Sequence, residues 1–238
     1  MSTAHVDGRF RGPAGIGNGG YVAGRMAALL GSQPAEVMLR RGWPLDLPLT
    51  IAHDGGAVQA RDAEGNVSAE AREATLDLDP PAPPTHGEAA AATRWFLASP
   101  FTHSTGLCFV CGSAAPGGLG VFTGRVEGRP GIAAALWHPA AAFAGPDGRI
   151  APEFLWAALD CAGAFAFTVE DRPQRMLLGR ITGRLDGMVV PGEPIIVLGW
   201  QIGREGRKLH AGTALFGADG TLRGLARALW VLPAPVAG

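Results

Sequence analysis

Two runs of the sequence have the composition of buried helices. Residues 21–30 are rich in Ala, Leu and Met, and Gly31 follows them at a position where glycine commonly ends a helix. Residues 153–167 follow Pro152, which suits the first position of a helix because its missing N–H would be unpaired there. Both runs are apolar on nearly every face, so we expect other elements of the fold to enclose each helix.

Series of predicted strands accompany both helices, with apolar and polar residues alternating and turn residues between the segments. The turns include Asp54-Gly55-Gly56 in the first series and Ala218-Asp219-Gly220 in the second. The strands predicted after the first helix are residues 37–41, 47–53, 57–61 and 67–78. Those predicted around the second helix are residues 120–125, 132–138, 176–185, 194–202, 208–216 and 222–232.

A proline-rich segment, residues 79–84, separates two halves, because proline interrupts both helices and central strands. Residues 65–72 match residues 220–227 in turn, apolar alternation and arginine position. This indicates an internal duplication of a unit with one long helix and an antiparallel meander, although two unrelated α+β domains also fit. The expected division is a first unit over residues 1–79, a proline-rich linker with a short helix over 80–106, and a second unit over 107–238.

Composition and charge narrow the class of protein. The 238 residues are 47% apolar and 17% charged, which excludes a disordered tail and allows a large core. The net charge is −1, from 20 basic and 21 acidic residues, and no basic cluster suits nonspecific nucleic-acid binding. Residues 1–10 hold no apolar run of the signal-peptide kind, and no apolar stretch reaches the ~18–20 residues that span a bilayer. We therefore expect a soluble cytoplasmic protein without a nucleic-acid or membrane partner.

Three short motifs carry the candidate chemistry: Asn18-Gly19-Gly20 at the start of the first helix, Leu159-Asp160-Cys161-Ala162-Gly163 within the second, and Cys108-Phe109-Val110-Cys111-Gly112 followed by Gly118-Leu119. Together they resemble the hotdog-fold superfamily, specifically the phenylacetyl-CoA-type thioesterases. The resemblance implies an α+β fold of two tandem hotdog units, each a long central helix wrapped by an antiparallel sheet. The two units would form an intramolecular pseudo-dimer.

The motif of that family is divided between the two halves. Its members usually carry His-Gly-Gly at the helix start and an Asp nine residues after the His. Here Asn18 replaces the His and Ala27 stands nine residues later, whereas Asp160 has Ala151 nine residues before it. Because family members combine an amide and a carboxylate from opposite members of a pair, the resemblance implies one composite site. The mirror-related site, with Ala27 facing Glu153, would be inactive.

The composite site would join Gly19 or Gly20 to Asp160, with Asn18, in the place of the family's His, as a further catalytic candidate. Backbone N–H groups in the first turn of a helix lack intrahelical partners and can stabilise a thioester oxygen that gains charge. Asp160 has apolar neighbours, so burial should raise its pKa and suit it to act as general base or nucleophile. The alternatives are structural: Asn18 caps the helix, the glycines form a tight turn, and Asp160 pairs with an arginine such as Arg180 or Arg184.

Further residues are expected to bind the substrate. The acyl chain would run between the two helices past Tyr21, Met26 and Trp156 into an apolar slot. Thr182, on the strand after the second helix, would orient water. Arg207, in a charged hairpin, would bind the phosphates of coenzyme A, although charged hairpin tips are usually only solvated.

The spacing of the three cysteines in the sequence does not indicate a metal site. Cys108 and Cys111 resemble half a zinc knuckle, but no second CxxC or closely spaced His pair completes four ligands. His103 would add one ligand, and Cys161 belongs to the second helix. We therefore expect a tight turn with partly buried thiols and no metal.

The function expected from these residues is that of an acyl-CoA thioesterase-like hydrolase that uses no cofactor. Two alternatives remain open: a hotdog-fold enoyl-CoA hydratase or dehydratase that depends on His138, and a non-catalytic module that binds acyl-CoA or lipid. The sequence names neither the acyl group nor the oligomeric state, so the pseudo-dimers could associate further.

Overall fold

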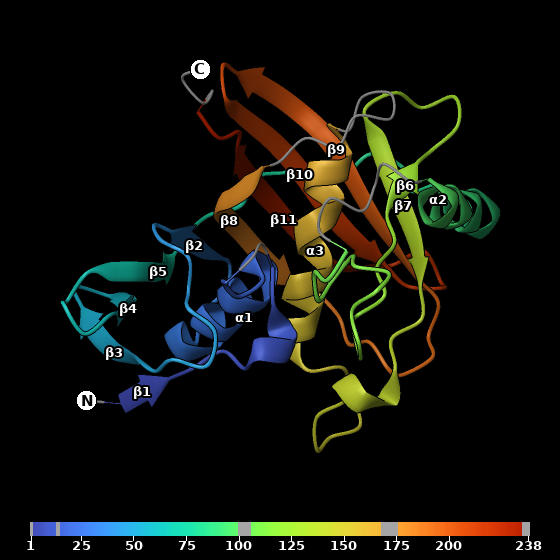
Figure 1. The fold of residues 1–238 in the computed structure, drawn as a ribbon. Helices are drawn as coiled ribbons and strands as arrows, with labels where there is room; N and C mark the ends of the chain where they lie inside the picture. The colour runs from blue at the N-terminus through green and yellow to red at the C-terminus, as the bar shows by residue number, and fades with distance from the viewer. Residues whose placement is uncertain (1, 13–14, 100–105, 168–175, 235–238) are drawn as a thin grey trace.

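An antiparallel sheet runs through the computed structural model, which describes residues 2–12, 15–99, 106–167 and 176–234 (Figure 1). Its described strands are β1 (Ser2–Ala4), β2 (Ala35–Leu39), β3 (Leu49–Asp54), β4 (Ala57–Arg61), β5 (Val67–Glu73), β6 (Gly124–Arg125), β7 (Ile132–Trp137), β8 (Leu177–Leu185), β9 (Ile195–Glu205), β10 (Lys208–Phe216) and β11 (Leu222–Val231). The α-helices are α1 (Gly19–Leu30), α2 (His86–Ala98) and α3 (Pro152–Phe165).

The strand order is mirrored about the centre of the sheet. The order is β1-β3-β4-β5-β2-β8-β11-β10-β9-β7-β6, and the pairing of β2 with β8 joins the two halves, with Val37 opposite Ile181. On either side of this junction β5 corresponds to β11, β4 to β10, β3 to β9 and β1 to β7. The segments with similar sequences, in β5 and β11, therefore occupy equivalent places.

The two apolar helices, α1 and α3, lie against each other on one side of the sheet (Figure 1). They run antiparallel, because Gly20 of α1 faces Ala157 and Gly24 faces Glu153. A Cβ atom at Gly24 would lie 2.6 Å from the Glu153 Cα atom, which is closer than atoms in proteins pack. The glycines therefore let the two helix backbones touch, and the sheet covers their remaining apolar faces.

Helix α2 covers the opposite face of the sheet. Gly199 of β9 faces α3, since a Cβ atom there would overlap the Ala162 carbonyl, so Leu198 and Trp200 face the other way. On that side they join a second apolar cluster with Ala89 and Ala92 of α2. The short linker helix expected within residues 80–106 is in fact a packed helix of 13 residues.

Local sequence explains where the helices begin and end. Thr85 and Glu88 form a capping box at the start of α2, and Pro152 occupies the first turn of α3. Gly31 ends α1 in the left-handed conformation, at φ 76°.

Most predicted strands are present, and two are much shorter than expected. β5 ends at Glu73 rather than at residue 78, and within residues 120–125 only Gly124–Arg125 form a strand. After β5 the chain passes along the outer face of the sheet, where Arg184 and Arg227 donate hydrogen bonds to the carbonyls of Leu76 and Asp77. No helix among the described residues is long and apolar enough to cross a membrane.

The contact between the helices predicts opposite effects for two Gly→Ala substitutions. Gly24→Ala should lower the free energy of unfolding by about 1–3 kcal/mol, because the new methyl group would overlap Glu153 and Trp156. Gly87→Ala in α2 is the matched control: the nearest atom to its new Cβ is Thr85 Oγ1 at 3.9 Å, so helix propensity should raise stability by up to ~1 kcal/mol. Urea unfolding measures both, and equal effects of the two variants would contradict the proposed backbone contact.

Candidate functional site

Asp160 lies in the middle of α3 and is held by the amino end of α1. Its side chain is 2% exposed, and its Oδ2 atom accepts hydrogen bonds from Asn18 Nδ2 and from the Gly20 backbone N–H, both at 2.9 Å. The second oxygen, Oδ1, is buried and has no hydrogen-bond partner among the described residues. The structure thus brings together the two segments that the sequence analysis assigned to one composite site.

No arginine neutralises this carboxylate within the described part of the chain. Arg180 pairs with Glu36 at 3.5 Å and Arg184 with Asp186 at 2.7 Å. Both arginines that the sequence offered as structural partners of Asp160 therefore have other partners. The expectation of such an ion pair is wrong.

Asn18 has two roles at the start of α1. Its Oδ1 atom accepts a hydrogen bond from the Tyr21 N–H at 2.9 Å and caps the helix, while its Nδ2 atom donates to Asp160. Backbone hydrogen bonds to Phe10 and Trp43 fix the preceding turn. Capping and contact with the carboxylate, considered above as alternatives, are both present in one side chain.

Burial controls the charge of Asp160. Loss of solvent around the carboxyl group and, to a smaller extent, the nearby Cys108 together raise its pKa to about 7, against the opposing hydrogen bonds from Gly20 and Asn18. A carboxyl group with such a pKa is suited to proton transfer near neutral pH.

Gly19 is the residue in the first turn of α1 whose backbone N–H group is available to a ligand. The Gly20 N–H is bonded to Asp160 and the Tyr21 N–H to Asn18, whereas no residue among those described accepts from the Gly19 N–H. Gly19 is half-buried, and a Cβ atom there would lie 3.0–3.1 Å from the side chains of Leu178 and Leu39. The first amide of α1 therefore lies beside an apolar wall.

Cys161, the neighbour of Asp160 in α3, meets the CxxC turn. The sulfur atoms of Cys108, Cys111 and Cys161 all lie within 4.8 Å of one another, and the three side chains are buried. Donation from the Cys111 and Cys161 thiols lowers the pKa of Cys108, and the same contact with Cys108 raises the pKa of Cys161. This cluster was not apparent from the sequence. His103, which was considered as a further ligand, lies outside the described residues.

The predicted acyl slot between the helices is wrong. A Cβ atom at Gly20 would lie 2.5 Å from Asp160 Cβ and 2.7 Å from the Trp156 carbonyl oxygen, so no chain can pass there. Tyr21 stacks on Phe10 with ring centroids 4.0 Å apart, accepts a hydrogen bond from Arg25 and has its pKa raised by burial. Trp156 is buried, and its ring lies against Gly183.

Two other predicted substrate contacts are not at the site. Gly183 faces Trp156, so the neighbouring Thr182 points to the opposite face of the sheet, where its hydroxyl donates to Glu36 at 3.4 Å. Its prediction as a water-orienting residue is therefore wrong. Arg207 donates to the Leu232 carbonyl at 3.1 Å in an exposed hairpin, and the structure gives it no contact with Asp160 or α1.

His138 is exposed at the end of β7, where none of its described contacts involves Asp160.

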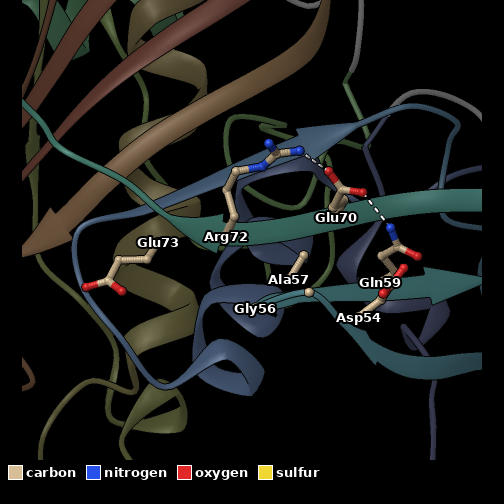
Figure 2. A pocket seen from close by; sticks show the side chains of 8 residues that line it. Asp54, Gly56, Ala57, Gln59, Glu70, Arg72 and Glu73 are labelled. Carbon is tan, nitrogen blue, oxygen red and sulfur yellow. Dashed lines mark hydrogen bonds and ion pairs between the residues drawn. The ribbon is translucent and has the colours of Figure 1, made fainter.

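A polar hollow on β4 and β5 is separate from this site (Figure 2). Gln59 and Glu70 face each other across the two strands and are joined by a 2.6 Å hydrogen bond, and Glu70 also pairs with Arg72 and Arg40. Their neighbours Val58 and Ala71 point into the core, so the hollow lies on the outer face. Its central carboxylate is already paired.

Comparison with known proteins identifies the fold. No family model and no curated protein matches the sequence. The tesB protein of Mycobacterium avium subs paratuberculosis has a similar structure, with a TM-score of 0.62 and 14% identity over 98% of this chain and 92% of that chain.

Two smaller structures match part of the chain. A phenylacetic acid degradation-related protein from Ralstonia eutropha JMP134 has a TM-score of 0.43 and 21% identity over 50% of this chain and 94% of that chain. The E. coli PaaI protein from the phenylacetic acid degradation operon has a TM-score of 0.47 and 10% identity over 61% and 96%. The fold assignment depends on the likeness to the tesB protein, which covers almost all of both chains. This chain therefore has the hotdog fold, as the likeness to the tesB protein over almost all of both chains indicates.

Proposed function

We propose that this chain hydrolyses an acyl thioester of coenzyme A at one composite site between two tandem hotdog units. The observation that carries the proposal is the buried Asp160 carboxylate. One of its oxygens is bonded to the amino end of α1, and the other has no partner in the part of the chain that the structure describes. Coenzyme A is proposed as the thiol because the motifs resemble those of phenylacetyl-CoA-type thioesterases.

The mirrored strand order supports the tandem arrangement. Each proposed unit contributes a central helix and the four strands that follow it, α1 with β2 to β5 and α3 with β8 to β11. The units meet at the β2–β8 pair and at the antiparallel contact of their helices. The carboxylate and the amides of the site then come from different units.

The proposed reaction uses two groups of the chain. Asp160 Oδ1 takes a proton from water as the water oxygen attacks the thioester carbonyl carbon, or Oδ1 attacks that carbon itself and water later cleaves the mixed anhydride. The Gly19 N–H donates to the carbonyl oxygen as it gains negative charge. The C–S bond then breaks, the thiol leaves with a proton, and the products are a carboxylic acid and coenzyme A.

Leu39 and Leu178 flank Gly19, so we propose that the part of the acyl group next to the carbonyl packs on these side chains. The acyl chain then lies along the sheet side of α1 rather than between the helices. The exposed position of His138 gives no support to a hydratase, because that reaction would need an imidazole next to the carboxylate.

Replacement of the carboxylate tests the proposal. Asp160→Asn keeps an oxygen acceptor for Gly20 but removes the base or nucleophile, so thiol release from a panel of acyl-CoAs should fall by roughly 100-fold or more. Glu153→Gln, on the same helix but at the mirror-related site that faces Ala27, is the matched control and should keep most of the activity.

Unchanged turnover in Asp160→Asn, with a melting temperature like that of the wild type, would overturn the assignment. Loss of turnover only in Glu153→Gln would place the active site at the mirror-related position, where Ala27 faces Glu153. A wild-type protein that binds acyl-CoA but releases no thiol would favour the non-catalytic binding module.

Asn18 allows capping and carboxylate positioning to be separated. Asn18→Ser keeps a side-chain oxygen that can cap α1 but removes the amide donor to Asp160. We expect a melting temperature close to that of the wild type and a loss of about tenfold or more in kcat, since a hydrogen bond to a charged group contributes ~1.5–3 kcal/mol.

Asn18→Ala is the comparison variant, because it loses the donor and the cap together and should also unfold at a lower temperature. If Asn18→Ser has wild-type kcat and only Asn18→Ala is impaired, Asn18 acts through helix stability alone.

A further inference from the structure

Three buried sulfur atoms converge from two distant parts of the chain. Cys108 and Cys111 stand in the turn that follows α2 along the sequence, and Cys161 projects from α3. All three are thiols rather than disulfides, and their sulfur atoms lie within 4.8 Å of one another. This spacing is close to the one that a shared metal ion requires, since Zn–S bonds of 2.3 Å place tetrahedral ligands about 3.8 Å apart.

The CxxC turn is built to present sulfur inward. Backbone N–H groups of Val110 and Cys111 donate to the Cys108 sulfur, which supports its thiolate form. Gly112 closes the turn: its N–H donates to the Cys108 carbonyl at 2.8 Å, and a Cβ atom there would lie 2.5 Å from that oxygen. No other residue fits this position without displacing the turn.

Neighbouring segments hold the turn in place. The Phe109 N–H donates to the Arg11 carbonyl at 2.7 Å, and the Phe109 and Val110 carbonyls accept from Leu119 and Val121 at 2.6 and 2.9 Å. Asn18 Nδ2 also lies 3.8 Å from the Cys108 sulfur, next to its 2.9 Å bond to Asp160. The ligand set is therefore largely formed before any ion binds.

We propose that Cys108, Cys111 and Cys161 bind a zinc ion. Metal binding releases the protons of cysteine thiols, and a purely thiolate ligand set selects soft or borderline ions such as zinc. The three sulfur atoms leave the fourth tetrahedral position for water. The ion would tie the CxxC turn to the residue next to Asp160, so its role is to fix the position of α3 at the site.

Metal analysis of the full chain tests this site. The protein is produced with zinc in the medium and purified with a reductant, without chelators and without an affinity tag. Elemental analysis should find about one zinc per chain, and replacement of zinc by cobalt should give the intense near-ultraviolet absorption of thiolate-to-cobalt charge transfer.

Cys108→Ser and Cys161→Ser should each lose most of the bound metal. His138→Ala, which removes an exposed imidazole outside the cluster, is the matched control and should retain it. Retention of stoichiometric metal in both cysteine variants would overturn the proposal.

If the cysteine variants fail to fold, the wild type still decides the question. Chelator-treated protein is titrated with cobalt after all three of its thiols are shown to react with a thiol reagent under denaturing conditions. A charge-transfer band that saturates near one equivalent supports the site, and reduced protein without any band overturns it. Since metal content is read directly, a negative result would leave the proposed hydrolysis untouched.

Discussion

The contact between the amino end of α1 and the middle of α3 is the constraint on which the rest of the structure depends. A carboxyl group as buried as Asp160 is costly unless hydrogen bonds satisfy it, and here the donors come from the other helix. They reach it only because Gly20 and Gly24 bring the two backbones into contact. The electrostatics of the site and the packing of the core are thus set by the same few residues.

The sheet fixes the position of α1 relative to α3, which the contact at Asp160 also requires. β2 and β8 pair at the centre of the sheet, and each lies in the half whose helix precedes it in the sequence. Any shift of one half against the other would break main-chain hydrogen bonds as well as the contact at Asp160. Helix α2 adds to this rigidity on the outer face, where it packs against β7 and β6 and its alanines share an apolar cluster with Leu198 and Trp200 of β9.

The sequence predicted the two apolar helices and the meeting of the first turn of α1 with Asp160 in one site, because both depend on local composition and short motifs. Prediction from the sequence failed where a residue's role depended on the direction of its side chain or on how two elements pack. Thr182 was placed on the wrong face, since neighbouring strand residues point to opposite sides. The cysteine cluster was missed because the approach of Cys161 to the CxxC turn depends on how α3 packs, which no spacing along the chain reveals. The acyl slot was misplaced for a similar reason, as the closeness of the helices is set by glycines whose neighbours are distant in sequence.

Asn18 and Asp160 belong to one polypeptide although 142 positions separate them. Dilution therefore cannot part them, as it can part residues held on two dissociating subunits, and every folded molecule carries one carboxylate for one set of donors. A substitution on either side of this contact also appears once per molecule rather than twice.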